Sequence, residues 1–110
     1  MEISFSDFEK ADIRVGKIIG VEDFPGTRVP SYKLLIDFGT EIGLKRSSAH
    51  VANYKPDDLL GKKIIAVVNL PPKKVKGFES EVLVLGVPDS GGNVILLVPD
   101  KDAPLGSRMF

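Results

Sequence analysis

The sequence predicts an all-β domain, a small barrel of five to six strands with little helix. Three observations support this fold class. Short runs rich in β-branched and aromatic residues recur along the chain and are bounded by glycine and proline. Glycines lie inside the first run, where they permit the curvature that a closed sheet needs. With 110 residues, the chain is long enough for one core, so we expect residues 1–110 to form a single domain.

The beginning of the chain is expected to form a short helix followed by a strand. Ser6 and Glu9 fit a capping box, with Ser6 as the N-cap and Glu9 at the third helical position. Residues 13–21 are strand-like, and Gly16 and Gly20 suggest bulges or bends within that strand. Alternation predicts that four apolar side chains share one face of it: Ile13, Val15, Ile19 and Val21.

The next two strands are expected to form a hairpin. Residues 24–30 are rich in turn formers, and residues 32–38 follow as a strand with alternating apolar residues. Leu34, Ile36 and Phe38 fall on one face. Residues 37–41 then turn tightly into a third strand at residues 42–47.

A helical insert is expected between the third and fourth strands. Ser48 is a candidate cap for one or two helical turns. Residues 56–61 fit a further turn, with Pro56 at its first position and Gly61 at its end. Strands at residues 64–68 and 82–85 then enclose a rigid, basic loop, and residues 94–98 supply the sixth strand. Six strands with a helix between the third and fourth match the OB-fold, a Greek-key barrel.

Composition favours a cytoplasmic protein that does not insert into membranes. The chain has no cysteine, which excludes a disulfide framework and cysteine metal sites. No apolar run approaches the roughly 20 residues of a membrane span, and residues 1–5 do not resemble a signal peptide.

The charge is unevenly distributed although the net charge is zero. Residues 41–80 carry 8 basic and 4 acidic groups, whereas residues 1–40 carry 5 and 7, and residues 81–110 carry 2 and 4. The middle of the chain is therefore a mild basic footprint, and phosphate binding there should be modest and sensitive to salt.

Motifs for catalysis are missing from the sequence. It contains no glycine-rich phosphate loop, no nucleophile motif and no paired-histidine metal motif. His50 is the single histidine and is expected to have a structural role. We therefore predict that the chain is not an enzyme and uses no cofactor or metal.

Four motifs together resemble a known family. They are Asp-Ile-Arg-Val-Gly at residues 12–16, Asp-Phe-Gly at 37–39, Lys-Arg-Ser-Ser-Ala at 45–49, and the long segment at 67–83 that contains Asn-Leu-Pro-Pro-Lys-Lys-Val-Lys-Gly-Phe-Glu-Ser. The sequence resembles, almost end to end, the stand-alone tRNA-binding-domain proteins, and most closely the CsaA-like branch of export-related chaperones. Related domains are appended to methionyl- and phenylalanyl-tRNA synthetases.

The resemblance implies an OB-fold barrel and a homodimer built from the N- and C-terminal segments. It assigns the interface to apolar residues near both termini: Ile3, Phe5, Phe8, Leu105, Met109 and Phe110. The alternative is that these side chains cover the barrel of their own chain.

Candidate residues for binding a peptide or tRNA centre on the basic loop. They are Lys45, Arg46, Ser48, Asn69, Lys73, Lys74, Lys76, Phe78 and Ser80. Lysines would contact phosphates, Asn69 and Ser80 would donate or accept hydrogen bonds, and Phe78 would contribute to an apolar pocket. The alternatives are a solvated basic loop and, for Asn69, satisfaction of local backbone groups. Arg14 lies among apolar residues, and an ion pair with Asp12 or Glu41 is an alternative to a ligand contact.

One departure from the family pattern bears on function. Family members that bind tRNA usually place a small residue and then a methionine after the serine that matches Ser80, whereas Glu81, Val82 and Leu83 follow it here. This difference favours the chaperone branch. The first hypothesis is an ATP-independent, export-related chaperone that binds unfolded or pre-export polypeptides; the alternative is a structure-specific tRNA-binding module acting in trans.

Overall fold

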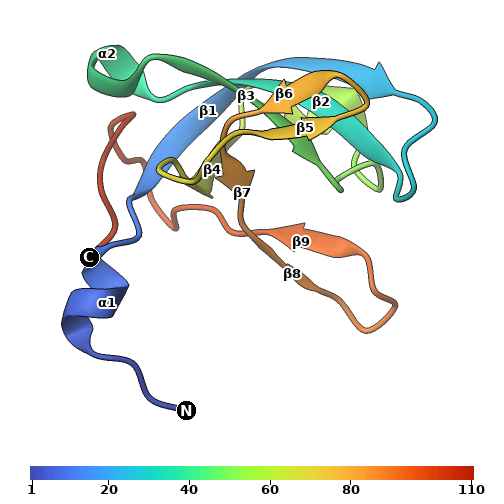
Figure 1. The fold of residues 1–110 in the computed structure, drawn as a ribbon. Coiled ribbons are helices and arrows are strands. Elements are labelled where there is room, and N and C mark those ends of the chain that lie inside the picture. The colour runs from blue at the N-terminus through green and yellow to red at the C-terminus, as the bar shows by residue number, and fades with distance from the viewer.

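The barrel is formed by short antiparallel strands, and a computed structural model describes all of residues 1–110 (Figure 1). Its strands are β1 (Ile13–Phe24), β2 (Ser31–Asp37), β3 (Leu44–Ala49), β4 (Lys63–Val67), β5 (Lys73–Val75), β6 (Phe78–Ser80), β7 (Leu83–Val84), β8 (Gly86–Pro88) and β9 (Val94–Leu96). Its helices are α1 (Phe5–Glu9), α2 (Gly39–Ile42) and α3 (Pro56–Leu59). The fold is mostly β with short helices, as the sequence predicts.

Five strands form the main sheet in the order β3-β2-β1-β4-β7. The long strand β1 is central because its first half pairs with β4 and its second half with β2, both antiparallel. Two separate hairpins, β5–β6 and β8–β9, extend from this sheet. The five-stranded antiparallel half-barrel, with α3 between β3 and β4, is consistent with the OB-fold and confirms the predicted fold class.

The C-terminal segment runs along the first half of β1, on the edge that does not pair with β4. The Gly106 and Met109 N–H groups donate to the carbonyls of Val15 (2.8 Å) and Ile13 (2.7 Å), and the Val15 N–H donates to Ser107 (3.0 Å). Helix α1 therefore lies next to the C-terminus, whereas the N-terminal end of the chain extends away from it (Figure 1).

A bulge in β1 changes which residues face the core. The register shifts between Ile18 and Gly20, so Ile18 is fully buried and Ile19 is 42% exposed. The predicted shared face is wrong for this reason: the strand does not alternate regularly across the bulge. Gly16 permits the curvature, since a Cβ atom there would lie 2.6 Å from the side chains of Ile36 and Phe38.

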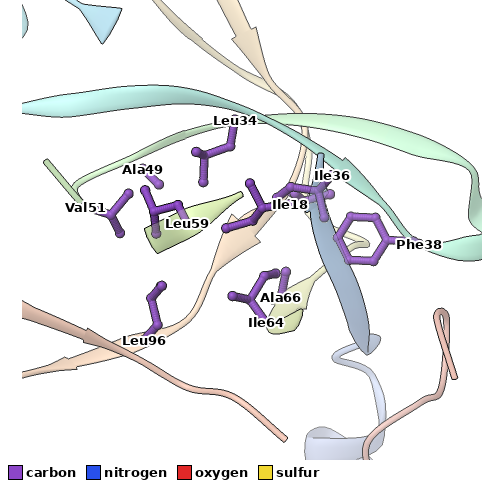
Figure 2. Packing of buried hydrophobic residues seen from close by; sticks show 11 residues of the cluster. Ile18, Leu34, Ile36, Phe38, Ala49, Val51, Leu59, Ile64, Ala66 and Leu96 are labelled. Carbon is purple, nitrogen blue, oxygen red and sulfur yellow. The ribbon is translucent and has the colours of Figure 1, made fainter. Parts of the chain in front are cut away.

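The core fills the interior of the half-barrel (Figure 2). Leu34, Ile36 and Phe38 lie side by side on one face, at most 2% exposed, as alternation along β2 predicts. Leu59 from α3 is fully buried in the same cluster, so the helical insert covers the barrel interior. Pro56 at the start of α3 has the predicted first-turn position.

Three local predictions are wrong. The N-cap of α1 is Ser4, with Asp7 completing the capping box, so the predicted box at Ser6 and Glu9 is displaced by two residues. Ser48 lies within β3 and caps no helix, because that strand continues to Ala49. The predicted basic loop contains the β5–β6 hairpin, and a further strand, β8, follows β7, so the strand count is nine rather than six.

The helices are all short. None of them has the length and apolar character needed to cross a membrane.

Candidate binding groove

A groove of about 770 Å³ lies between the β1–β2 loop, the β5–β6 hairpin and the start of β7. Its lining residues come from segments that are distant in sequence: Thr27, Arg28, Val29, Ser31, Ser48, His50, Leu70, Pro71, Lys73, Lys74, Val75, Ser80, Glu81, Val82 and Leu83. This is the volume range of ligand sites in proteins.

The groove has apolar walls and a basic rim. Leu70 is 46% exposed, Leu83 50% and Val29 45%, so these large apolar side chains meet solvent in the groove. Lys73 and Lys74 are exposed and form no salt bridge, and the same holds for Arg28. The groove therefore offers apolar contact together with uncompensated positive charge.

The β5–β6 hairpin is held against the barrel by Lys76 and Phe78. The Lys76 Nζ donates a hydrogen bond to the Gly26 carbonyl (3.0 Å). The Phe78 ring packs edge-on against Phe24, with 5.6 Å between ring centroids. The Lys33 Nζ lies over both rings, at 4.9 Å from Phe24 and 5.4 Å from Phe78. These contacts position one wall of the groove.

Side chains close the barrel between β3 and the segment after β6. The Ser48 N–H donates to the Ser80 Oγ, and the Arg46 N–H donates to the Glu81 Oε1, both at 2.9 Å. The Glu81 N–H donates in return to the Arg46 carbonyl (2.8 Å). The Ser47 Oγ, almost fully buried, donates to the Val82 carbonyl (2.9 Å). We call this junction of β3 with residues 80–84 the seam.

Arg46 is electrically compensated at the seam. Its guanidinium lies 3.6 Å from Glu81 and 3.9 Å from Glu79, and stacks at 5.6 Å over the Phe78 ring. The acid that follows Ser80 in the sequence is therefore a structural partner of the barrel edge. It also reduces the charge that Arg46 presents to a phosphate.

The structure places four of the predicted binding residues in the groove: Ser48, Lys73, Lys74 and Ser80. Lys76 and Phe78 do not line the groove; they hold the β5–β6 hairpin against the barrel. Lys45 and Arg46 are neighbours on β3, so their side chains point to opposite faces. Asn69 contacts the chain itself: its Oδ1 accepts from the Asp12 N–H (2.8 Å) and its Nδ2 donates to the Lys10 carbonyl (2.7 Å).

Several groove residues were missed in the sequence. Arg28 and Val29 belong to a turn, and His50 follows β3, so no local pattern connects them with the basic hairpin. Only the closure of the barrel brings them together. The charge of Arg28, on a turn, was the one signal in the sequence that pointed to this part of the groove.

A second hollow of about 280 Å³ continues the groove toward the β8–β9 hairpin. The two share Ser48, His50 and Leu83 in their linings. Further apolar residues of the second hollow come from β7, β8 and β9 and include Val84, Val87 and Leu96. The combined depression is therefore elongated and apolar over much of its length.

Arg14 forms the ion pair that the sequence suggested as its alternative role. Its Nε donates to the Asp12 Oδ1 (2.6 Å), and its Nη1 donates to the Gly106 carbonyl (2.9 Å) and lies 3.6 Å from Glu41. The hydrogen bond from Arg14 holds the pKa of Asp12 below its ordinary value, and Arg108 contributes in the same direction. The bond with Asp12 raises the pKa of Arg14. This network joins β1 to the C-terminal segment.

Apolar side chains gather where α1 meets the C-terminal residues. Phe5, Phe8, Met109 and Phe110 surround a hollow of about 440 Å³, and Phe5 is 71% exposed. Ile3 is also exposed nearby in sequence, at 64%. Leu105 lies elsewhere, with its backbone against Gly39 of α2. No group of three or more His, Cys, Asp or Glu side chains is arranged to hold a metal ion.

Residues 13–108 match the family model of the putative tRNA binding domain. Among curated relatives, the methionine–tRNA ligases of Pyrococcus horikoshii and Methanocaldococcus jannaschii are 44% and 43% identical over 97% and 98% of this chain. The chain spans only 14% and 16% of the length of those ligases.

Solved structures match over the whole chain. The CsaA chaperone protein from Picrophilus torridus is 53% identical with a TM-score of 0.93, covering 99% of this chain and 100% of that one. Chaperone CsaA from Bacillus anthracis is 48% identical with a TM-score of 0.91 and full coverage of both chains. A MetRS-related protein from Pyrococcus horikoshii, also fully covered, is 33% identical with a TM-score of 0.85.

Proposed function

We propose that this chain is an ATP-independent, export-related chaperone of the cytoplasm. The chain belongs to the putative tRNA-binding-domain family and is CsaA-like, which supports the proposal. It binds unfolded or pre-export polypeptides through the groove, on an OB-fold homodimer. The observation that carries the proposal is the combination of exposed Val29, Leu70 and Leu83 in one elongated groove with a basic rim.

The mechanism is holding. An unfolded chain exposes apolar side chains, and burial of these against the groove walls removes about 25 cal/mol of unfavourable hydration per Å². Bound chain is withdrawn from the pool that aggregates, in proportion to concentration and affinity. Release then follows dissociation, since no nucleotide step belongs to the mechanism.

The test is light scattering of a chemically denatured client diluted into buffer. The protein in stoichiometric excess is expected to slow the rise in scattering, and an equal mass of serum albumin serves as the control for crowding. Unchanged aggregation at stoichiometric excess would contradict the chaperone function.

The second candidate function is binding of tRNA in trans. It is favoured by the match of residues 13–108 to the putative tRNA binding domain and by the unpaired Lys73 and Lys74. Replacing both lysines by alanine should weaken tRNA binding and flatten the salt dependence by about one unit of slope per lost phosphate contact. A binding curve that the double replacement leaves unchanged would exclude this site.

The homodimer belongs to the same proposal. Exposed Phe5, Met109 and Phe110 lie together where α1 meets the C-terminus, and a second copy would cover them. Sedimentation equilibrium should give a dimer for the native chain. Phe5→Asp combined with Phe110→Asp should shift it toward monomer, and a native monomer at micromolar concentration would contradict this part.

A further inference from the structure

The seam between β3 and residues 80–84 is closed by hydrogen bonds at Arg46, Ser47 and Ser48, and it is open beyond them. We propose, on the premise of the proposed function, that a guest polypeptide binds as an extended strand in the open part of the seam. There its own backbone pairs with the exposed edges of β3 and β7. Its side chains contact the groove, but its backbone supplies the recognition.

The outer edge of β3 carries backbone groups without a partner. Both the N–H and the carbonyl of Arg46 point away from β2, because both bond to Glu81. Backbone direction alternates along a strand, so the Ser48 carbonyl points the same way as Arg46; β3 ends at Ala49, and His50 follows it in a bend. The Ser48 N–H is taken by Ser80. No backbone hydrogen bond outside the strand ladders uses the Ser48 carbonyl or the His50 N–H.

The outer edge of β7 is unpaired in the same way. Leu83 lies opposite Val67 of β4, and the Leu85 N–H donates to the Ile65 carbonyl (2.9 Å). Leu83 and the Leu85 N–H therefore face β4, whereas the Leu85 carbonyl accepts from the Leu97 N–H (3.1 Å). Val84, between them, directs its N–H and carbonyl away from β4, and no hydrogen bond outside the ladders uses either group.

These two edges line one hollow. Ser48, His50 and Val84 all border the hollow of about 280 Å³ that continues the groove. A pair of unpaired strand edges is a template for strand addition. Every polypeptide has the same backbone, so pairing of this kind recognises an extended chain without requiring one sequence.

The groove adds side-chain preferences to this backbone recognition. Side chains of an extended strand alternate in direction, so every second residue of the guest would lie on the same face as Leu83, which lines the groove. The rim cations Arg28, Lys73 and Lys74 have no acidic partner and complement a carboxylate near one end of the guest. The occupant is thus an extended segment with alternating apolar residues and a terminal acidic group.

The experiment uses synthetic peptides that differ only in backbone hydrogen-bond donors. The parent peptide alternates leucine and threonine and ends in glutamate. Two derivatives replace the amide N–H by an ester oxygen, one at every leucine and the other at every threonine. Strand addition predicts that at least one derivative binds about three- to tenfold more weakly per lost hydrogen bond, because its side chains are unchanged.

Amide hydrogen exchange of the protein supplies the second readout. Saturation with the parent peptide should slow exchange at Val84, whose N–H faces away from β4, and should leave Leu83, already paired with β4, unchanged. Equal affinity of all three peptides, without new protection at Val84, would overturn strand addition while leaving the chaperone proposal intact. Failure of the parent peptide to bind at any concentration would instead overturn the proposed function.

Discussion

Replacement of Glu81 separates its structural contribution from its effect on charge. The Glu81 Oε1 accepts the Arg46 N–H at 2.9 Å, and the same oxygen lies 3.6 Å from the Arg46 Nε. Glu81→Ala removes both interactions and leaves a strand-edge donor to be satisfied by water. Glu81→Gln keeps an oxygen acceptor of nearly the same shape and removes only the charge. The pair of variants therefore distinguishes the hydrogen bond from the ion pair.

The expected magnitudes follow from burial. A hydrogen bond to a charged group contributes about 1.5–3 kcal/mol, and partial exposure of Glu81 moves the expected loss for Glu81→Ala to about 1–2 kcal/mol. Arg46 is half exposed, so loss of its ion pair in Glu81→Gln should lower the free energy of unfolding by at most about 1 kcal/mol. Urea unfolding followed by circular dichroism measures both values.

The same variants report on nucleic-acid binding. Glu81→Gln frees Arg46 from its nearest acid, so affinity for tRNA should rise, with a salt slope steeper by up to about one unit. Two results would refute this account of the seam. One is a Glu81→Ala variant as stable as the native protein; the other is a Glu81→Gln variant as destabilised as Glu81→Ala.

Three other replacements test the frame around the groove. Asn69→Ala should lower the free energy of unfolding by about 1–2 kcal/mol, because its two hydrogen bonds to the backbone are lost. The affinity for polypeptide should not change. A loss of affinity without a loss of stability would show instead that Asn69 contacts the ligand. Gly16→Ala should lower the free energy of unfolding, measured in urea, by about 1–3 kcal/mol, because its new Cβ overpacks the core. Gly20→Ala should lower it by less than about 1 kcal/mol, since the new Cβ there would meet only Leu35, at 3.2 Å. Equal losses in the two variants would contradict the packing argument. Asp12→Asn should lower stability by about 1 kcal/mol at neutral pH. The pKa of Asp12 is lowered in the folded state by Arg14, so its contribution is present above the ordinary aspartate pKa of about 4 and disappears as pH falls through the folded value. Urea midpoints of the native protein and the Asp12→Asn variant should converge across that range, and a constant difference would refute the assignment.

Local sequence patterns predicted the strands whose side chains alternate regularly. Leu34, Ile36 and Phe38 alternate without interruption, so their shared buried face followed directly from period two. Pro56 marked the first turn of α3 because its fixed φ and missing N–H suit that position. The bulge after Ile18 could not be positioned in the same way, since it depends on how β1 divides its pairing between β2 and β4.

The groove depends on closure of the barrel and is therefore harder to predict. Lys73 and Lys74 were identified because charge accumulates locally, whereas Arg28 and His50 reach the same groove only through tertiary pairing. In the sequence, Glu81 was identified only as part of a departure from the family pattern after Ser80. Its hydrogen bond with the Arg46 N–H shows a structural role that no spacing rule in the sequence reveals.

The measurement that tests the central claim most directly is fluorescence anisotropy of a labelled, permanently unfolded polypeptide. It is titrated with the native protein, Leu83→Gln and Leu44→Gln. The two leucines are similarly exposed, at 50% and 55%, but Leu83 lines the groove whereas Leu44 borders neither the groove nor its continuation. The account predicts that Leu83→Gln weakens binding several-fold while Leu44→Gln binds like the native protein. Equal binding by all three proteins, or no binding by any of them, would contradict the claim that this groove holds unfolded chains.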